Sequence, residues 1–353
     1  MIIITGSTGL IGSSTSEYFL KKKHKVIGID NNLRSYFFGK TASNLWKEKN
    51  LKKNKLYKHY RTDIRNKSAI FKIFKKFSKK IKAVIHTAAQ PSHDWAVKEP
   101  FTDFHINATG TLNLLEAFKK YCPNASFVFT STNKVYGDTP NFLPLNEKKL
   151  RYEINKNHQY YKKGIDEKMS IDHTKHSLFG ASKTSADILV QEYGKYFNLK
   201  TACFRGGCLT GENHTGAELH GFLSFLVKSI INNKKYFVFG YKGKQVRDNI
   251  HSLDVVRAFD QFIKKPKRGA NVYNLGGGRE NSCSILEAIE LIEKISNKKS
   301  RYEILKKNRI GDHIWWISNN SKFKKDFPNW KIQISLKESL EQMVKFELSR
   351  KYK

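Results

Sequence analysis

The sequence predicts an α/β protein with a doubly wound parallel sheet, and three observations support this fold class. Short apolar segments alternate with stretches of helical pattern, a glycine-rich turn follows the first segment, and an acidic residue ends the second. Alternation of this kind is typical of parallel strands joined by crossover helices. The expected strands cover residues 2–5, 25–29, 56–61, 82–87, 126–131 and 200–204.

The first strand runs into a turn with the spacing of a dinucleotide-binding loop. Three glycines, at positions 6, 9 and 12, separate this strand from a helix expected at residues 13–22. Glycine is needed where a side chain would block the turn, the phosphate or the strand beneath it, and the first amides of the helix can bind a pyrophosphate. We therefore expect a dinucleotide to contact Gly6, Thr8, Gly9, Leu10, Ile11 and Gly12.

An acidic residue at the end of the second strand indicates which dinucleotide is bound. Asp30 can accept hydrogen bonds from both ribose hydroxyls and would repel a 2′-phosphate, which favours NAD over NADP as the cofactor. Arg34 lies nearby in the sequence and keeps NADP open as an alternative. We expect Asn31 and Asn32, directly after Asp30, to belong to the same site.

The ends of the third, fourth and fifth strands provide further candidate contacts to the cofactor. An acid after the third strand can face the adenine amino group, or it can be an ordinary helix N-cap. Small residues after the fourth strand let the backbone come close to a ligand. An asparagine inside the following helix usually has a structural or binding reason unless it is exposed. The expected contacts are Asp63, Ile64, Ala88, Ala89, Gln90, Asn107 and Thr130.

The regular alternation ends near residue 204, and this change suggests a second lobe. Loops are expected at 205–217 and 239–249, and helices at 217–232, 252–264, 283–296 and 336–349. We interpret residues 1–204 as the cofactor-binding domain, to which roughly 249–275 return. Residues 205–353 would then form mainly a substrate-binding lobe.

Composition narrows the function classes. The 353 residues include 65 basic and 31 acidic ones, a net charge of +34, but the basic residues occur as scattered pairs and triplets, which favours a solvated surface over a specific nucleic-acid site. The four cysteines lack the spacing of a zinc site, so no metal is expected. No segment approaches the roughly 20 apolar residues of a membrane span, so we expect a cytoplasmic protein.

Three further motifs resemble a known superfamily. They are the segments 131–137 (Ser-Thr-Asn-Lys-Val-Tyr-Gly), 179–183 (Phe-Gly-Ala-Ser-Lys) and 246–251 (Val-Arg-Asp-Asn-Ile-His). With the glycine turn, they resemble the extended short-chain dehydrogenase/reductases, the NAD-dependent sugar-nucleotide epimerases and dehydratases with a Rossmann fold, over nearly the whole chain. Segments 131–138 and 243–248 and the long insert at 145–178 are most similar to the CDP-paratose 2-epimerase family.

This resemblance implies an activity and a set of residue roles. A sugar hydroxyl would be oxidised by tightly held NAD, and the keto intermediate would rotate in the site and be reduced on its opposite face. The epimerised sugar would then be used in polysaccharide biosynthesis. Thr132 would bond the reacting oxygen, Lys183 would hold the nicotinamide ribose, and Arg247 would bind the pyrophosphate of a nucleotide sugar, a CDP-sugar being favoured. Alternatively, Thr132 could merely end a strand, Lys183 could be an ordinary helix lysine, and Arg247 could be a surface charge. Further substrate contacts would be Thr132, Asn133, Arg205, Lys244, Arg309 and Asp312.

By the same resemblance, the protein would form a homodimer or a higher homo-oligomer. The usual dimer of the superfamily pairs two helices from each subunit, which correspond here to residues 101–121 and 179–197.

One position departs from the superfamily pattern. The motif is Tyr-x-x-x-Lys, and Phe179 occupies the tyrosine position. A phenyl ring cannot transfer the proton that must leave the hydroxyl, and loss of such a base costs on the order of 10²- to 10⁴-fold in rate. Another group could replace it, with His176 the first candidate; the reaction could differ; or the site could bind ligand without turnover. The other candidate bases are Tyr160, Tyr161, His173 and Cys208.

The 4,6-dehydration of a sugar nucleotide is a related reaction whose required residues can be looked for in the sequence. The 4,6-dehydratases resemble this chain but carry an Asp-Glu pair after the strand-end threonine, where the acids eliminate water. The corresponding residues here are Asn133 and Lys134. Without a positioned acid and base at these places, epimerisation is favoured over dehydration.

Overall fold

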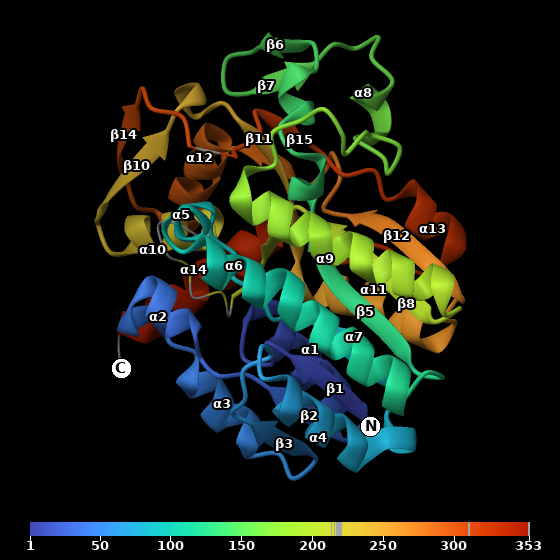
Figure 1. Cartoon of the computed structure of the whole chain (residues 1–353). Coiled ribbons are helices and arrows are strands. Elements are labelled where there is room, and N and C mark those ends of the chain that lie inside the picture. Colours follow the sequence, from blue (N-terminus) through green and yellow to red (C-terminus); the bar gives the residue numbers. More distant parts are fainter. Residues whose placement is uncertain (213, 215, 217–220, 310, 352–353) are drawn as a thin grey trace. The chain divides into compact units, whose positions relative to one another are not determined.

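The chain folds into two compact units in the computed structural model, which describes residues 1–212, 214, 216, 221–309 and 311–351 (Figure 1). Unit 1 consists of residues 1–135, 178–205 and 255–273, and unit 2 of residues 136–177, 206–254 and 274–353. The insert region 136–177, which the sequence-based division assigns to the cofactor-binding domain, therefore packs within unit 2.

Unit 1 is built on a seven-stranded sheet of order β12-β8-β5-β4-β1-β2-β3. The pairs from β3 across to β5 are parallel, with Ile3 opposite Ile27 on one side and Val84 on the other. The predicted fold class is confirmed. The strands are β1 (Ile2–Thr5), β2 (Val26–Ile29), β3 (Tyr57–Tyr60), β4 (Ala83–His86), β5 (Ser126–Thr132), β8 (Lys200–Gly206) and β12 (Gly269–Leu275), the last of which was not expected.

Helices cover both faces of this sheet. On one face lie α4 (Lys67–Phe77), α7 (Gly110–Tyr121) and α9 (Ser177–Tyr196), and α7 and α9 run side by side (Figure 1). Their apolar residues, such as Ile70, Leu114 and Val190, pack against the strands. The other face carries α1 (Leu10–Lys21), α3 (Leu45–Lys52) and α11 (Ser252–Lys264). Shorter helices are α2 (Arg34–Phe38), α5 (His93–Lys98) and α6 (Pro100–Phe104), which continues through one π-helical turn (His105–Thr109) into α7.

Unit 2 has a small sheet in which β11 (Val246–His251) pairs with β9 (Cys208–Thr210), β13 (Ser282–Ser284) and β15 (Trp315–Trp316). A second sheet joins β10 (Lys235–Phe239) to β14 (Arg301–Leu305), and a hairpin joins β6 (Leu145–Glu147) to β7 (Tyr152–Ile154). The apolar core lies among α10, α12 and α14. The helices are α8 (Tyr160–Lys163), α10 (Phe222–Ile231), α12 (Ile285–Ser296), α13 (Ser321–Asp326) and α14 (Leu336–Lys351).

The two loops expected in this region were wrong. The loops expected at 205–217 and 239–249 contain β9 and most of β11, because β11 is a strand of polar residues buried on both faces. Asp248, for example, accepts hydrogen bonds from the backbone amides of Gly278 and Ser318. Such a strand has no hydrophobic alternation to detect. The helix expected at 217–232 begins at Phe222 in the structure; residues 217–220 lie outside the described part.

Helix α12 begins later than the expected 283–296 because its first residues form β13. The Ser284 side chain accepts a hydrogen bond from the Glu287 amide, and the Glu287 carboxylate accepts one from the Ser284 amide. This reciprocal capping box fixes the start of the helix at Ile285. Across the described residues, no helix combines the length and apolar character needed to cross a bilayer.

Candidate active site

The glycine turn has the backbone geometry that a dinucleotide loop requires. Gly6 has φ of +64°, and a Cβ there would lie 2.7 Å from the amide nitrogen of Ala88. A Cβ at Gly12 would collide with the carbonyl oxygen of Gly6. The loop thus packs against β1 and the segment after β4 with no room for side chains, and α1 begins directly after Gly9. Thr8 lies in this turn, and Leu10 and Ile11 are the first two residues of α1; all three are expected beside a pyrophosphate.

Asp30 is fixed at the end of β2 by hydrogen bonds from the glycine turn. Its Oδ2 accepts from the backbone amide of Thr8 at 3.0 Å and from the Thr8 hydroxyl at 2.7 Å. Its Oδ1 accepts from the amide of Asn32 at 2.8 Å. The carboxylate expected to bind ribose hydroxyls is therefore directly connected to the loop expected to bind phosphate.

The residues expected near the adenine also lie together. Asn31 donates from Nδ2 to Asp63 at 2.8 Å, and the Arg65 guanidinium donates to both oxygens of the same carboxylate. Burial alone would raise the pKa of Asp63, but the bonds from Arg65 and Asn31 lower it below its ordinary value. The carbonyl of the buried Ile64 is bonded by Asn113 Nδ2.

Gln90 and Asn107 are hydrogen-bonded to each other and belong to one buried polar network. Asn107 accepts from the Gln90 amide through Oδ1 and donates through Nδ2 to Ser182 Oγ on α9. Both amide side chains also donate to Asp103, whose pKa burial raises to about 6. The network anchors the segment after β4, which contains Ala88 and Ala89, to α9. Asp103 is a member that the sequence analysis missed, because a buried acid on a short helix has no pattern to reveal it.

Lys183 lies at the carboxyl end of β5, the strand that carries Thr132. Its ammonium donates to the carbonyl of Thr130 at 2.9 Å and lies 4.2 Å from the centre of the Phe129 ring. The side chain is buried, and this burial lowers the pKa of Lys183 to about 8 against the opposing effects of Asp187 and Cys203. The structure thus brings the two residues of the expected catalytic pair to one strand end.

The polar side chains at this strand end are half-buried or buried. Thr132 Oγ1 accepts a hydrogen bond from the amide of Lys134 at 3.2 Å, and Asn133 beside it is buried. The hydroxyl of Thr130 is buried and has no hydrogen-bond partner among the residues that the structure describes. A buried hydroxyl in this state fits a site where a polar ligand supplies the missing partner.

Arg205 has a structural partner that the sequence analysis did not foresee. Its guanidinium binds both oxygens of Asp187, at 3.2 Å from Nε and 2.8 Å from Nη2, and both side chains are almost fully buried. Ser131 and Gln191 also donate to Asp187. This ion pair joins β8 to α9, which is an alternative to the predicted substrate contact of Arg205.

In unit 2, Arg247 forms an ion pair with Asp312, and Lys244 donates to Glu147 of the insert hairpin at 2.7 Å. Arg247 is buried on β11 and also donates to the carbonyl of Val246. Two predicted substrate contacts that are 65 residues apart are thus neighbours. Arg309 is half-buried in the same segment as Asp312, whose amide donates to the Arg309 carbonyl.

The candidate replacement bases of unit 2 lie in different elements. His176 is half-buried and His173 exposed in the segment before α9, Tyr160 and Tyr161 begin α8, and Cys208 is half-buried on β9. Tyr160 is buried, and burial raises its pKa above the ordinary value.

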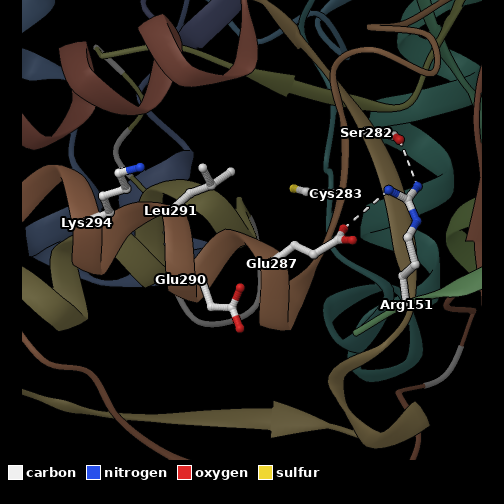
Figure 2. Close-up of a pocket in the computed structure, with 7 residues that line it drawn as sticks. All are labelled: Arg151, Ser282, Cys283, Glu287, Glu290, Leu291 and Lys294. Atoms are coloured by element: carbon white, nitrogen blue, oxygen red, sulfur yellow. Dashed lines mark hydrogen bonds and ion pairs between the residues drawn. The ribbon is translucent and has the colours of Figure 1, made fainter. Parts of the chain in front are cut away.

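A pocket of about 390 Å³ opens beside α12 in unit 2 (Figure 2). Arg151 contacts Ser282 and Glu287 at its edge, and Glu287 is already held by the capping box. Two basic and two acidic side chains line it, so it favours neither anions nor cations. None of the predicted site residues lines it; the lining residues are Arg151, Ser282, Cys283, Glu287, Glu290, Leu291 and Lys294.

The fold and the site define a class of protein. A parallel sheet whose first strand enters a glycine turn, with an acid at the tip of the second strand, is a dinucleotide-binding arrangement. The collision of any Cβ at Gly12, the oriented Asp30 and the buried Thr130 hydroxyl fit a dinucleotide at this edge.

Comparison with known proteins identifies the family within this class. The NAD-dependent epimerase/dehydratase family matches residues 2–276. CDP-paratose 2-epimerase of Salmonella typhi is 30% identical over 348 residues, 97% of this chain and 97% of the relative. UDP-glucuronate 4-epimerase of Thermodesulfobacterium geofontis is 31% identical over 97% of this chain and 94% of its own. The chain belongs to the NAD-dependent epimerase/dehydratase family, and its cofactor is NAD.

Solved structures agree with this assignment. UDP-glucuronic acid 4-epimerase from Bacillus cereus, in complex with UDP-glucuronic acid and NAD, superposes with a TM-score of 0.80 at 25% identity, covering 99% of both chains. A tyrosine-to-phenylalanine variant of that enzyme, in complex with a fluorinated nucleotide sugar and NAD, gives the same values.

Proposed function

We propose that this protein is a nucleotide-sugar epimerase that inverts C2 of a CDP-linked deoxysugar. The observation that carries the proposal is the grouping at the end of β5, where Thr132 lies two residues beyond the carbonyl that binds the buried ammonium of Lys183. A protein that only sensed NAD would not need a threonine hydroxyl at the place where a sugar oxygen reacts.

The residues of the chain divide the work as follows. NAD would be held by the glycine turn and Asp30, and when bound it would supply a reversible hydride acceptor. The Thr132 hydroxyl donates a hydrogen bond to the reacting sugar oxygen, and Lys183 orients the cofactor ribose and supplies positive charge to the site. Arg247 binds the pyrophosphate of the substrate through its fork of donors, while Asp312 and Arg309 contact its nucleoside. The predicted contacts Asn133, Arg205 and Lys244 belong to the same proposal.

The choice of a CDP-sugar is supported by the similarity to CDP-paratose 2-epimerase, which extends over 97% of both chains. UDP-glucuronate 4-epimerase is similar to the same degree, so UDP-glucuronate is the competing substrate to test. The absence of carboxylates at Asn133 and Lys134 favours epimerisation over dehydration. We place the protein in the cytoplasm, in polysaccharide biosynthesis, which fractionation of the source cells would check.

A second candidate function is binding of NAD and a nucleotide sugar without turnover. The observation that favours it is Phe179, which is buried at the tyrosine position. In a relative, a tyrosine-to-phenylalanine substitution is compatible with both ligands, as the complex described above indicates.

Proton NMR of the purified protein with CDP-paratose and added NAD tests these alternatives. We expect the anomeric signals of the C2 epimer to appear. If the protein binds CDP-paratose in calorimetry but leaves its spectrum unchanged, the epimerase proposal fails and the binding function is supported. Conversion of UDP-glucuronate instead of CDP-paratose would contradict the choice of nucleotide sugar.

We further propose a homodimer formed through α6, α7 and α9 of unit 1. These helices carry exposed apolar side chains, among them Phe101 at 80%, Phe104 at 49% and Ile188 at 42% exposure. Exposed apolar groups in this number indicate a protein interface. Sedimentation equilibrium should give twice the chain mass for the wild type, and the monomer mass for Phe101→Glu combined with Ile188→Glu. A monomeric wild type would contradict this assembly.

A further inference from the structure

The phenyl ring of Phe179 lies against an imidazole. Phe179 is on α9, one turn before Lys183, and is only 7% exposed. The ring of His93 meets it edge to face, with 4.9 Å between ring centres and 69° between ring planes. An ionisable ring therefore contacts the side chain that stands where a tyrosine hydroxyl would serve the reaction.

His93 is held in place by the segment that the cofactor site also uses. It is the first residue of α5, which Ser92 caps by accepting from the Trp95 amide. Gln90, three residues earlier, is anchored by the buried network described above. Trp95, on the other side, packs against Phe37 with 5.3 Å between ring centres. His93 as a whole is half-buried, so a residue with a fixed backbone keeps part of its surface accessible.

We propose that His93 is the general acid and base of the reaction and replaces the missing tyrosine; this inference rests on the proposed epimerase function. In the oxidation step, a nitrogen of His93 takes the hydroxyl proton as the C–O double bond forms and the hydride leaves the same carbon for NAD. In the reduction step, the hydride returns to the opposite face and the imidazolium gives the proton back to the oxygen. Histidine suits this exchange because its ordinary pKa is near neutrality.

Charged side chains are carried by the elements that pack around this contact. They are Lys183 on α9, Asp103 on α6, Arg34 on α2, and Asp94 on α5 itself. Burial lowers the pKa of Lys183 to about 8 and raises that of Asp103 to about 6, so both can change charge within the range in which an imidazole titrates. The pH–rate profile must therefore be compared between variants, because an ionisation seen in the wild type alone cannot be assigned to one residue.

The experiment compares three histidine-to-glutamine variants in the full chain, with CDP-paratose as the substrate. His93→Gln should lower turnover on the order of 10²-fold or more and remove one ionisation from the pH–rate profile. His105→Gln, at an exposed position in the π-helical turn, is the matched control and should change neither. His176→Gln tests the candidate chosen from the sequence. Bound NAD, measured after denaturation, should stay at the wild-type level in all three.

A rescue variant separates chemistry from packing. Phe179→Tyr restores the hydroxyl of the superfamily pattern, so the double variant His93→Gln, Phe179→Tyr should regain at least tenfold over His93→Gln alone. If turnover of His93→Gln stays within about twofold of wild type, or if only His176→Gln loses turnover, the role of His93 is overturned while the epimerase proposal stands. A wild type that converts no CDP-paratose overturns the epimerase proposal and this inference with it.

Discussion

Replacing Lys183 with methionine should lower turnover on the order of 100-fold or more while the protein stays folded. Methionine matches the length of the lysine stem but lacks the ammonium that donates to Thr130. The folded state holds this ammonium in a buried position, and burial lowers the pKa of Lys183 to about 8. Removing the charge therefore relieves an unfavourable burial, and loses one hydrogen bond worth about 1 kcal/mol.

The pH dependence of stability provides a second measurement on the same variant. Between about pH 8 and the ordinary lysine pKa, the unfolded chain holds a proton that the folded chain has released, so the lysine makes wild-type stability rise with pH. The methionine variant should lack this rise. Melting followed by circular dichroism at pH 7 and pH 9.5 would measure it. Lys195→Met, at an exposed position on the same helix, should match the wild type in both turnover and melting; wild-type turnover by Lys183→Met would remove Lys183 from the reaction.

Replacing Asp187 with alanine should destabilise the fold by roughly 3–5 kcal/mol. The substitution leaves the Arg205 guanidinium buried without its bidentate partner, and also removes the acceptor for Ser131 and Gln191. Urea unfolding measures the change. Glu192→Ala is the control on the same helix, because its ion pair with Lys195 is exposed and should contribute less than about 1 kcal/mol.

A double variant distinguishes an isolated charge from lost packing. Adding Arg205→Met to Asp187→Ala removes the unpaired cation and should recover part of the lost stability. If Asp187→Ala is no more destabilising than Glu192→Ala, the ion pair has no structural role, and the predicted substrate contact of Arg205 becomes the better explanation of that residue.

The cofactor-binding part of the fold could be predicted because each of its features is local in the sequence. The strands β1, β2 and β4 and the first part of β5 are short apolar runs, and the glycine turn and Asp30 occur within 30 residues. Periodicity and turn chemistry act over such distances, so the fold class, a doubly wound parallel sheet, followed from them. The missed strand β12 begins with the polar segment Gly269-Ala270-Asn271, which reads as a loop without its neighbour β8.

The polar interior could not be predicted because its partners are distant in the sequence. Asp187 pairs with Arg205 across 18 residues, Arg247 with Asp312 across 65, and Asn107 with Ser182 across 75. A buried polar residue has no periodic signal, and only its partner explains it. The contact between His93 and Phe179 is of the same kind, which is why the sequence directed attention to His176 instead.

The three hydrogen bonds that Asp30 receives from Thr8 and Asn32 mean that folding itself orients this carboxylate. The entropy of fixing the side chain is lost when the protein folds, so it does not weaken the binding of a ribose. A carboxylate held rigidly also repels a 2′-phosphate more strongly, because it cannot rotate away from that second negative charge. If Asp30 binds the ribose as we expect, Thr8 contributes to the discrimination between dinucleotides, and removing its hydrogen bonds to Asp30 should weaken selectivity before it weakens affinity.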